Sequence, residues 1–125
     1  NIMENVKNNF VKGRVRSIRY AVSGALLLLK TEHAIITQFS IGILFIILGF
    51  VVGINKTEWM IQIICFGFVL ATEGLNTTIE KICDYIQPEY HKQIGLIKDI
   101  SAGAVTFAAL TAIVIILIIY IPYLF

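Results

Sequence analysis

Two uncharged stretches decide the fold of this chain: residues 34–54, AIITQFSIGILFIILGFVVGI, and residues 100–121, ISAGAVTFAALTAIVIILIIYI. They contain 21 and 22 residues. About 20 predominantly apolar residues are enough for a helix to cross the roughly 30 Å hydrocarbon core of a bilayer. Each stretch therefore predicts a transmembrane helix, the first over residues 34–54 and the other over residues 98–121.

The composition of the whole chain agrees with a membrane protein. Of its 125 residues 58% are apolar and 14% are charged, whereas about 25% of the residues in a soluble domain are charged. The length allows a single domain. The net charge of +2 is too small to predict a nucleic-acid partner.

A further transmembrane helix is predicted between these two, over residues 59–86. Residues 59–72 carry no charge, and the helical pattern then continues through the acidic positions to a stop at Pro88. Only residues 55–57 separate this helix from the first span, so we expect a tight turn and an antiparallel hairpin. Cys65 and Cys83 lie too far apart on one helix to form a disulfide within it and are interpreted as packing residues.

The N-terminal part is predicted to form an amphipathic helix over residues 10–31 that lies on the membrane surface with its cations toward anionic headgroups. The alternative is a solvated basic tail. Nine of the ten Lys and Arg residues fall on one side of the predicted spans, which the positive-inside rule places in the cytoplasm. Trp59, Tyr120 and Tyr123 would then gather at the opposite interface, where aromatic residues are enriched.

The middle helix carries an acidic stripe. At 100° per residue, Glu73, Glu80 and Asp84 lie within about 40° of one another, flanked by Asn76 and Thr77. An ionised side chain at membrane depth costs about 2.5–3.5 kcal/mol on the insertion scale, so a bound cation or a partner charge is expected to compensate. The alternative, protrusion of this part of the helix into water, suits Asp84 better than Glu73.

Another acid, Glu32, precedes the first span at the level that Glu80 approaches. Two carboxylates from different helices could hold Mg²⁺ together with phosphate oxygens, and Lys98, just before the last span, could bind an anion. These residues describe a phosphoryl-transfer site whose acceptor is a lipid, although no P-loop, GxGxxG or kinase catalytic-loop motif is present. His33 beside Glu32 is interpreted as an interfacial polar residue rather than a ligand.

Small residues predict close helix packing on two spans. Gly49 and Gly53 form a GxxxG pair, and the last span carries a stripe of Ser101, Ala104, Ala108 and Ala112. Three helices give little shielding to a polar site in lipid, so we expect an oligomer.

Three motifs carry a resemblance to a known family: residues 71–84, ATEGLNTTIEKICD; residues 89–91, EYH; and residues 98–105, KDISAGAV. The chain resembles the small prokaryotic integral-membrane diacylglycerol kinases, which include the undecaprenol kinases, over about residues 14–121. The resemblance implies an all-α homotrimer in the bacterial cytoplasmic membrane. Each protomer would have three transmembrane helices and a surface helix, and would transfer the γ-phosphate of MgATP to a primary hydroxyl of a membrane lipid at the cytoplasmic face.

The resemblance also implies roles for single residues. Glu73 matches the general base, Glu32 and Glu80 match a metal-holding pair at the nucleotide, and Asn76 and Asp84 match supporting polar residues. Further nucleotide-contacting positions are matched by Tyr20, Glu89, Tyr90, His91, Lys98 and Asp99.

The chain departs from the family pattern at several positions. Many members have an Arg and then a His or Glu after the first acid, where this chain has Ile36 and Gln38, and an early nucleotide-contacting Arg aligns with Gly13 beside Arg14. The acceptor is expected to be undecaprenol or diacylglycerol, with undecaprenol slightly favoured by the KDISAGAV stretch. Two rival interpretations are a small multimeric transporter or channel subunit that uses the membrane-embedded acids, and a catalytically inactive lipid-binding scaffold.

Overall fold

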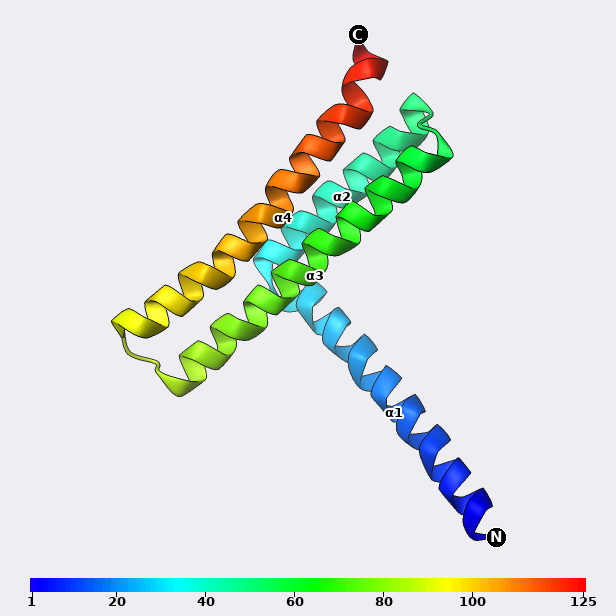
Figure 1. Cartoon of the computed structure of the whole chain (residues 1–125), viewed down its shortest axis with the longest axis vertical. Coiled ribbons are helices and arrows are strands. Elements are labelled where there is room, and N and C mark those ends of the chain that lie inside the picture. The colour runs from blue at the N-terminus through cyan, green and yellow to red at the C-terminus, as the bar shows by residue number, and fades with distance from the viewer. The chain divides into compact units, whose positions relative to one another are not determined.

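The computed structural model describes residues 1–125 and is entirely helical (Figure 1). Its four helices are α1 (Ile2–Thr31), α2 (His33–Val52), α3 (Lys56–Ile86) and α4 (Lys92–Leu124). They divide into two compact units, residues 1–32 and residues 33–125. Helices α2, α3 and α4 are each long and apolar enough to cross a membrane, as predicted.

The first unit is the single helix α1, which is longer than the predicted residues 10–31. It begins after Asn1, whose side chain accepts a hydrogen bond from the backbone N–H of Met3, so the cap starts the helix at Ile2. It ends at Glu32, which adopts an extended backbone conformation. None of its residues is buried. The predicted position of this helix on a membrane surface stays a prediction.

The second unit begins with a hairpin of α2 and α3, as expected, but the turn lies two residues earlier than predicted. Gly53 has a left-handed backbone with φ 80°, and the backbone N–H of Ile54 bonds the carbonyl of Gly49 at 3.1 Å. Asn55 and Glu58 then form a reciprocal capping box that starts α3 at Lys56. Gly53 therefore shapes the turn, whereas the sequence interpretation had assigned it to helix packing.

The connection from α3 to α4 spans residues 87–91, in agreement with the helix stop predicted at Pro88. The His91 ring accepts a hydrogen bond from the backbone N–H of Gln93 at 3.2 Å and so caps α4. Lys98 and Asp99 consequently lie inside α4, which begins six residues before the predicted residue 98. The absence of charge marks the membrane part of a helix but not the residue at which its hydrogen bonds begin.

Helix α3 packs against both α2 and α4 and runs antiparallel to both (Figure 1). The face of α4 that is buried carries Ser101, Ala108, Ile119 and Tyr120, so small side chains bring the two helices together as predicted. Ala104 is exposed and does not belong to this stripe. Cys65 and Cys83 are free and buried, which confirms their interpretation as packing residues.

Polar contacts link the helices at the end that carries the α2–α3 turn. The Tyr120 hydroxyl lies 2.6 Å from Oε1 of Gln62 and 3.1 Å from the backbone carbonyl of Phe45, and Nε2 of Gln62 donates to the same carbonyl at 3.1 Å. These bonds connect α2, α3 and α4 inside a cluster of Ile54, Ile119 and Tyr120, against which Trp59 packs. At this end the Tyr123 hydroxyl also donates to the Glu58 carboxylate. The predicted aromatic residues do gather at one end, with Tyr120 turned into the interior.

Candidate functional site

The acidic stripe of α3 faces the interior of the second unit at its deeper end. Glu73 is 7% exposed and Asn76 is 8% exposed, whereas Glu80 is half-buried and Asp84 is exposed. This gradient matches the predicted order of depth, because the three carboxylates lie on one helix face and only Glu73 is buried. The stripe therefore reaches from water into the interior of the unit.

Glu73 has no hydrogen bond and no ion pair within the chain. It lies 18 residues after Asn55 along α3, which corresponds to about 27 Å of helix rise. In a bilayer whose hydrocarbon core is roughly 30 Å thick, this position is close to the boundary opposite the α2–α3 turn. A buried carboxylate without a partner is expensive, so the site calls for a proton or a positively charged or hydrogen-bond-donating ligand.

Asn76 connects the deep and the shallow parts of the stripe. Its Nδ2 donates to Oε1 of Glu80 at 3.2 Å. Because a carboxylate can only accept, this bond fixes the orientation of the amide. The amide oxygen Oδ1 is the buried side-chain atom that is left without a hydrogen-bond partner, and such an atom costs about 1–3 kcal/mol. The amide thus offers a free oxygen beside the proposed metal-holding acid.

Lys98 of α4 lies across from the shallow end of the stripe. Its ammonium group is 2.8 Å from Oδ1 of Asp84, and both side chains are partly exposed. The sequence had assigned these residues to one site without indicating that they pair. The structure brings them together because α3 and α4 are antiparallel across a short turn.

A second group of predicted residues lies at the start of α4. Tyr90 and Asp99 line a shallow cavity of about 410 Å³ together with Lys92, Gln93, Gly95 and Leu96. Glu89 is exposed, and the Nδ1 atom of His91 is engaged as the cap of α4. Tyr90 and Asp99 are thus close to each other, while His91 has a structural role in addition to its predicted one.

Two predicted residues belong to the first unit. Tyr20 is exposed on α1, and Glu32, which ends that helix, accepts a hydrogen bond from Oγ1 of Thr31 at 3.3 Å. Their assignment to the nucleotide and the metal stays a prediction. No three His, Cys, Asp or Glu residues form a group that could hold a metal. Glu80 and the free oxygen of Asn76 are nevertheless hard oxygen donors, which fit Mg²⁺ bound largely through phosphates and water.

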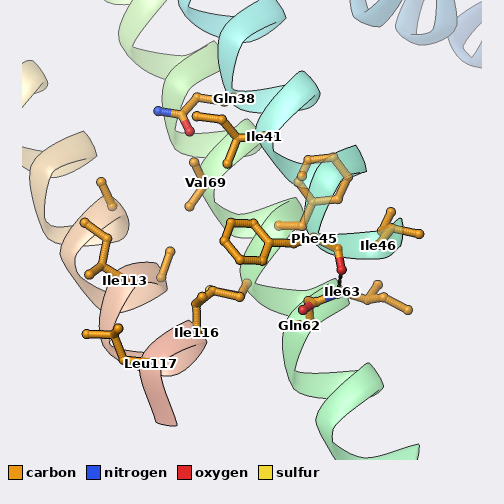
Figure 2. Close-up of a pocket in the computed structure, with 15 residues that line it drawn as sticks. Gln38, Ile41, Phe45, Ile46, Gln62, Ile63, Val69, Ile113, Ile116 and Leu117 are labelled. Carbon is orange, nitrogen blue, oxygen red and sulfur yellow. Dashed lines mark hydrogen bonds between the residues drawn. The ribbon is translucent and has the colours of Figure 1, made fainter. Parts of the chain in front are cut away.

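A groove opens beside the deep end of the stripe, between α2, α3 and α4 (Figure 2). Its volume is about 410 Å³ and its lining is almost entirely apolar. The two glutamines in the lining, Gln38 and Gln62, lie at opposite ends of it in Figure 2. At the Gln62 end, hydrogen bonds join Gln62 to Phe45 and Tyr120.

Three residues of this region were not predicted to contribute to a site. Gln62 follows the spacing of the buried α3 positions Cys65, Val69 and Glu73, and this spacing would have indicated an inward-facing polar residue. Gln38 was noted only as a departure from the family pattern. Gly42, where an added methyl group would lie 2.0 Å from Cε2 of Phe66, carries no signal beyond its small size.

Comparison with known proteins agrees with this arrangement. Residues 19–120 match the prokaryotic diacylglycerol kinase family. An undecaprenol kinase of Bacillus subtilis is 38% identical over 79 residues, which make up 63% of this chain and 64% of that protein, so the match spans just under two thirds of that relative. A diacylglycerol kinase of Haemophilus influenzae is 30% identical over 94 residues, 75% of this chain and 80% of that protein. These matches confirm the resemblance seen in the motifs: the chain belongs to the prokaryotic diacylglycerol kinase family, a family of lipid kinases.

Proposed function

We propose that this protein uses ATP and Mg²⁺ to phosphorylate the primary hydroxyl of a membrane lipid, undecaprenol rather than diacylglycerol. The observation that carries the proposal is the arrangement on α3, where a buried carboxylate without a partner, Glu73, shares one helix face with Glu80. Family membership supplies the reaction class. The residues of the stripe supply a place where a water-soluble donor and a membrane-bound acceptor can meet.

Glu73 acts as the base in this proposal. It lies deep enough to reach an alcohol in the bilayer, and it has no partner within the chain that would compete for the hydroxyl proton. Phosphoryl transfer is loose, so the base mainly orients the hydroxyl and receives its proton as the bond to phosphorus forms. Burial keeps water, a competing acceptor, away from the carboxylate.

The donor side of the site is built from residues nearer the surface. Glu80 and Glu32 hold Mg²⁺ with the phosphates in this proposal, and Lys98 exchanges Asp84 for a phosphate oxygen. When bound, Mg²⁺ neutralises phosphate charge and favours in-line geometry. The cavity that Tyr90 and Asp99 line at the start of α4 accepts another part of the nucleotide, with Tyr20, Glu89 and His91 as further contacts.

The choice of acceptor rests on the relatives and on one motif. The undecaprenol kinase match has the higher identity, 38% against 30% for the diacylglycerol kinase match, and the KDISAGAV stretch points the same way. The two lipids share a primary hydroxyl on a long apolar body. A direct comparison of both acceptors in mixed micelles, with wild-type enzyme and MgATP, decides between them.

The proposed assembly is a homotrimer in the cytoplasmic membrane of a bacterium, with the site at the cytoplasmic face. The large apolar residues exposed on α2, α3 and α4 support contact with lipid and with neighbouring copies. The basic residues near the Glu80 end support a cytoplasmic position for that end.

The proposed roles can be separated by two substitutions on α3. We expect Glu73→Gln to lose turnover by about two to four orders of magnitude while nucleotide binding survives. Glu80→Gln should instead raise the Mg²⁺ concentration needed for half-maximal rate. Glu58→Gln is the matched control, because Glu58 lies at the opposite end of α3 and Gln preserves the capping box. Near-normal turnover of Glu73→Gln would reject the assignment of the base.

A further inference from the structure

We infer that Glu58 forms an acid-sensitive latch, in which its carboxylate holds the last turn of α4 to the start of α3 and protonation of the carboxylate releases that turn. The latch lies at the end of the second unit opposite the acidic stripe, so it is independent of the proposed reaction. Three features carry the inference: the bonds that one oxygen of Glu58 accepts, the weak attachment of the last turn of α4, and the lack of any other side chain there that titrates in acid.

A single oxygen of Glu58 joins two helices. Its Oε1 accepts the backbone N–H of Asn55 at 3.0 Å, as part of the capping box, and it also accepts the hydroxyl of Tyr123 from α4. Hydrogen bonds to an ionised carboxylate are roughly twice as strong as those between neutral groups. The negative charge of Glu58 therefore strengthens the start of α3 and its contact with α4 together.

The last turn of α4 has few bonds of its own. Pro122 lies inside the helix and has no N–H, so one carbonyl of the preceding turn loses its helical donor. Beyond Pro122, the side chains of Leu124 and Phe125 are 69% and 101% exposed, so packing against the rest of the unit adds little. The bond from Tyr123 to Glu58 is thus the polar contact that attaches this turn to α3.

A second tyrosine of α4 makes a contact that acid does not open. One turn before Tyr123, the hydroxyl of Tyr120 lies 2.6 Å from Oε1 of Gln62, and both side chains are buried. Neither an amide nor a tyrosine hydroxyl titrates in the acid range. Because Pro122 lies between the two tyrosines, the residues after it can move while Tyr120 keeps the rest of α4 in register.

Glu58 is the side chain at this end that can respond to acid. Residues 49–55, at the end of α2 and in the turn, carry no titratable side chain. Helix α3 adds Lys56, and α4 adds Tyr120 and Tyr123, all of which keep their protons in acid. Glu58 is half-buried and Tyr123 is exposed, so protons from water reach their contact. In the orientation proposed above this end faces the outside of the cell, and the latch responds to external pH.

The test measures backbone hydrogen exchange of residues 123–125 in mixed micelles at about pH 7 and about pH 3.5, with the intrinsic effect of pH on exchange removed. Protection of these amides in the wild type should fall by about fivefold at the lower pH, because a bond to a charged group contributes more than a neutral one. Protection around Val69, in the middle of α3, should not change. A fall at both places would show general unfolding by acid and would overturn the latch.

Two substitutions separate the carboxylate from the hydroxyl. Glu58→Gln keeps an acceptor oxygen but cannot gain a proton in this range, so protection of residues 123–125 should be equal at the two pH values. Tyr123→Phe removes the donor, so protection should be about fivefold lower than in the wild type already at about pH 7. Tyr85→Phe is the matched control, because Tyr85 is 90% exposed on α3 and should behave as the wild type.

Fluorescence of the single tryptophan gives a second measurement. Trp59 follows Glu58 directly, and its ring centroid lies 4.8 Å from that of Phe50. A proton gained by Glu58 changes the charge beside this ring, so the wild type should show a reversible fluorescence transition between about pH 7 and about pH 3.5. Glu58→Gln should lack the transition.

Three results would overturn the latch: protection in the wild type that does not depend on pH, a fluorescence transition that persists in Glu58→Gln, and wild-type protection in Tyr123→Phe. Turnover enters none of these measurements. A chain that phosphorylates no lipid would therefore refute the proposed function and leave the latch standing, and failure of the latch would leave the proposed function untouched.

Discussion

The Lys98 ammonium lies 2.8 Å from the Asp84 carboxylate and joins the last turns of α3 to the start of α4. This pair does two things at once. It holds the Lys98 ammonium at the level of the acidic stripe, and in the proposed reaction a phosphate oxygen would take the place of the Asp84 carboxylate. The pair is partly exposed, so solvent and salt weaken it. Replacing the Asp84 carboxylate by another anion therefore costs little free energy.

Asp84→Asn should therefore have a small effect on stability. We expect the midpoint of thermal unfolding in detergent to fall by no more than about 3 °C, because exposed ion pairs contribute little. High salt should produce a similar fall in the wild type. Asp99→Asn is the control, since Asp99 follows Lys98 directly in α4 but makes no ion pair. A large loss of stability in Asp84→Asn alone would show that the pair is a structural anchor.

The buried bonds of Gln62 and Tyr120 should matter more for stability than for activity. Tyr120→Phe leaves Oε1 of Gln62 without its donor, and we expect a loss of about 1 kcal/mol, within the range for interhelical bonds in membranes. The double variant Gln62→Leu/Tyr120→Phe should lose less than the sum of the two single variants, because both partners are removed together. Unfolding in mixed micelles measures the cycle. Additive losses would show that the two side chains do not interact.

The close approach of Gly42 to Phe66 gives a prediction about helix packing. Gly42→Ala places a methyl group 2.0 Å from the present position of Cε2 in the Phe66 ring. The ring must move, and we expect a loss of about 1–3 kcal/mol in the free energy of unfolding. Phe66→Leu in the same chain should restore part of it. Gly67→Ala, where nothing lies within 4 Å of the added methyl, should be neutral or slightly stabilising.

Much of the fold follows from periodicity and charge. The three apolar helices, their antiparallel order and the burial gradient from Glu73 to Asp84 follow from one rule, that charge avoids hydrocarbon. The starts of α3 and α4 were misplaced because caps at Asn55 and His91 decide them, and these residues lie outside the uncharged stretches.

The groove and the polar link at its end could not be predicted in the same way. Gln62 and Tyr120 are 58 residues apart, and their contact depends on the rotation of two helices about their axes, which hydrophobicity alone sets only loosely. Whether Gln38 lines the groove likewise depends on the rotation of α2 about its axis. Family motifs identify residues of the acidic stripe, but they contain none of the alanines that leave the space open.

The lone burial of Glu73 predicts a conflict between stability and function. An acid at this depth without a partner destabilises the folded chain, so Glu73→Leu should raise the free energy of unfolding by about 1–3 kcal/mol while it abolishes phosphorylation. Asp84→Leu, a change at the exposed end of the same stripe, should give no such gain. Both variants can be compared by unfolding in micelles without nucleotide. If Glu73→Leu were less stable than the wild type, the carboxylate would have a compensating partner in the assembled protein, and the base would not be free to meet an alcohol.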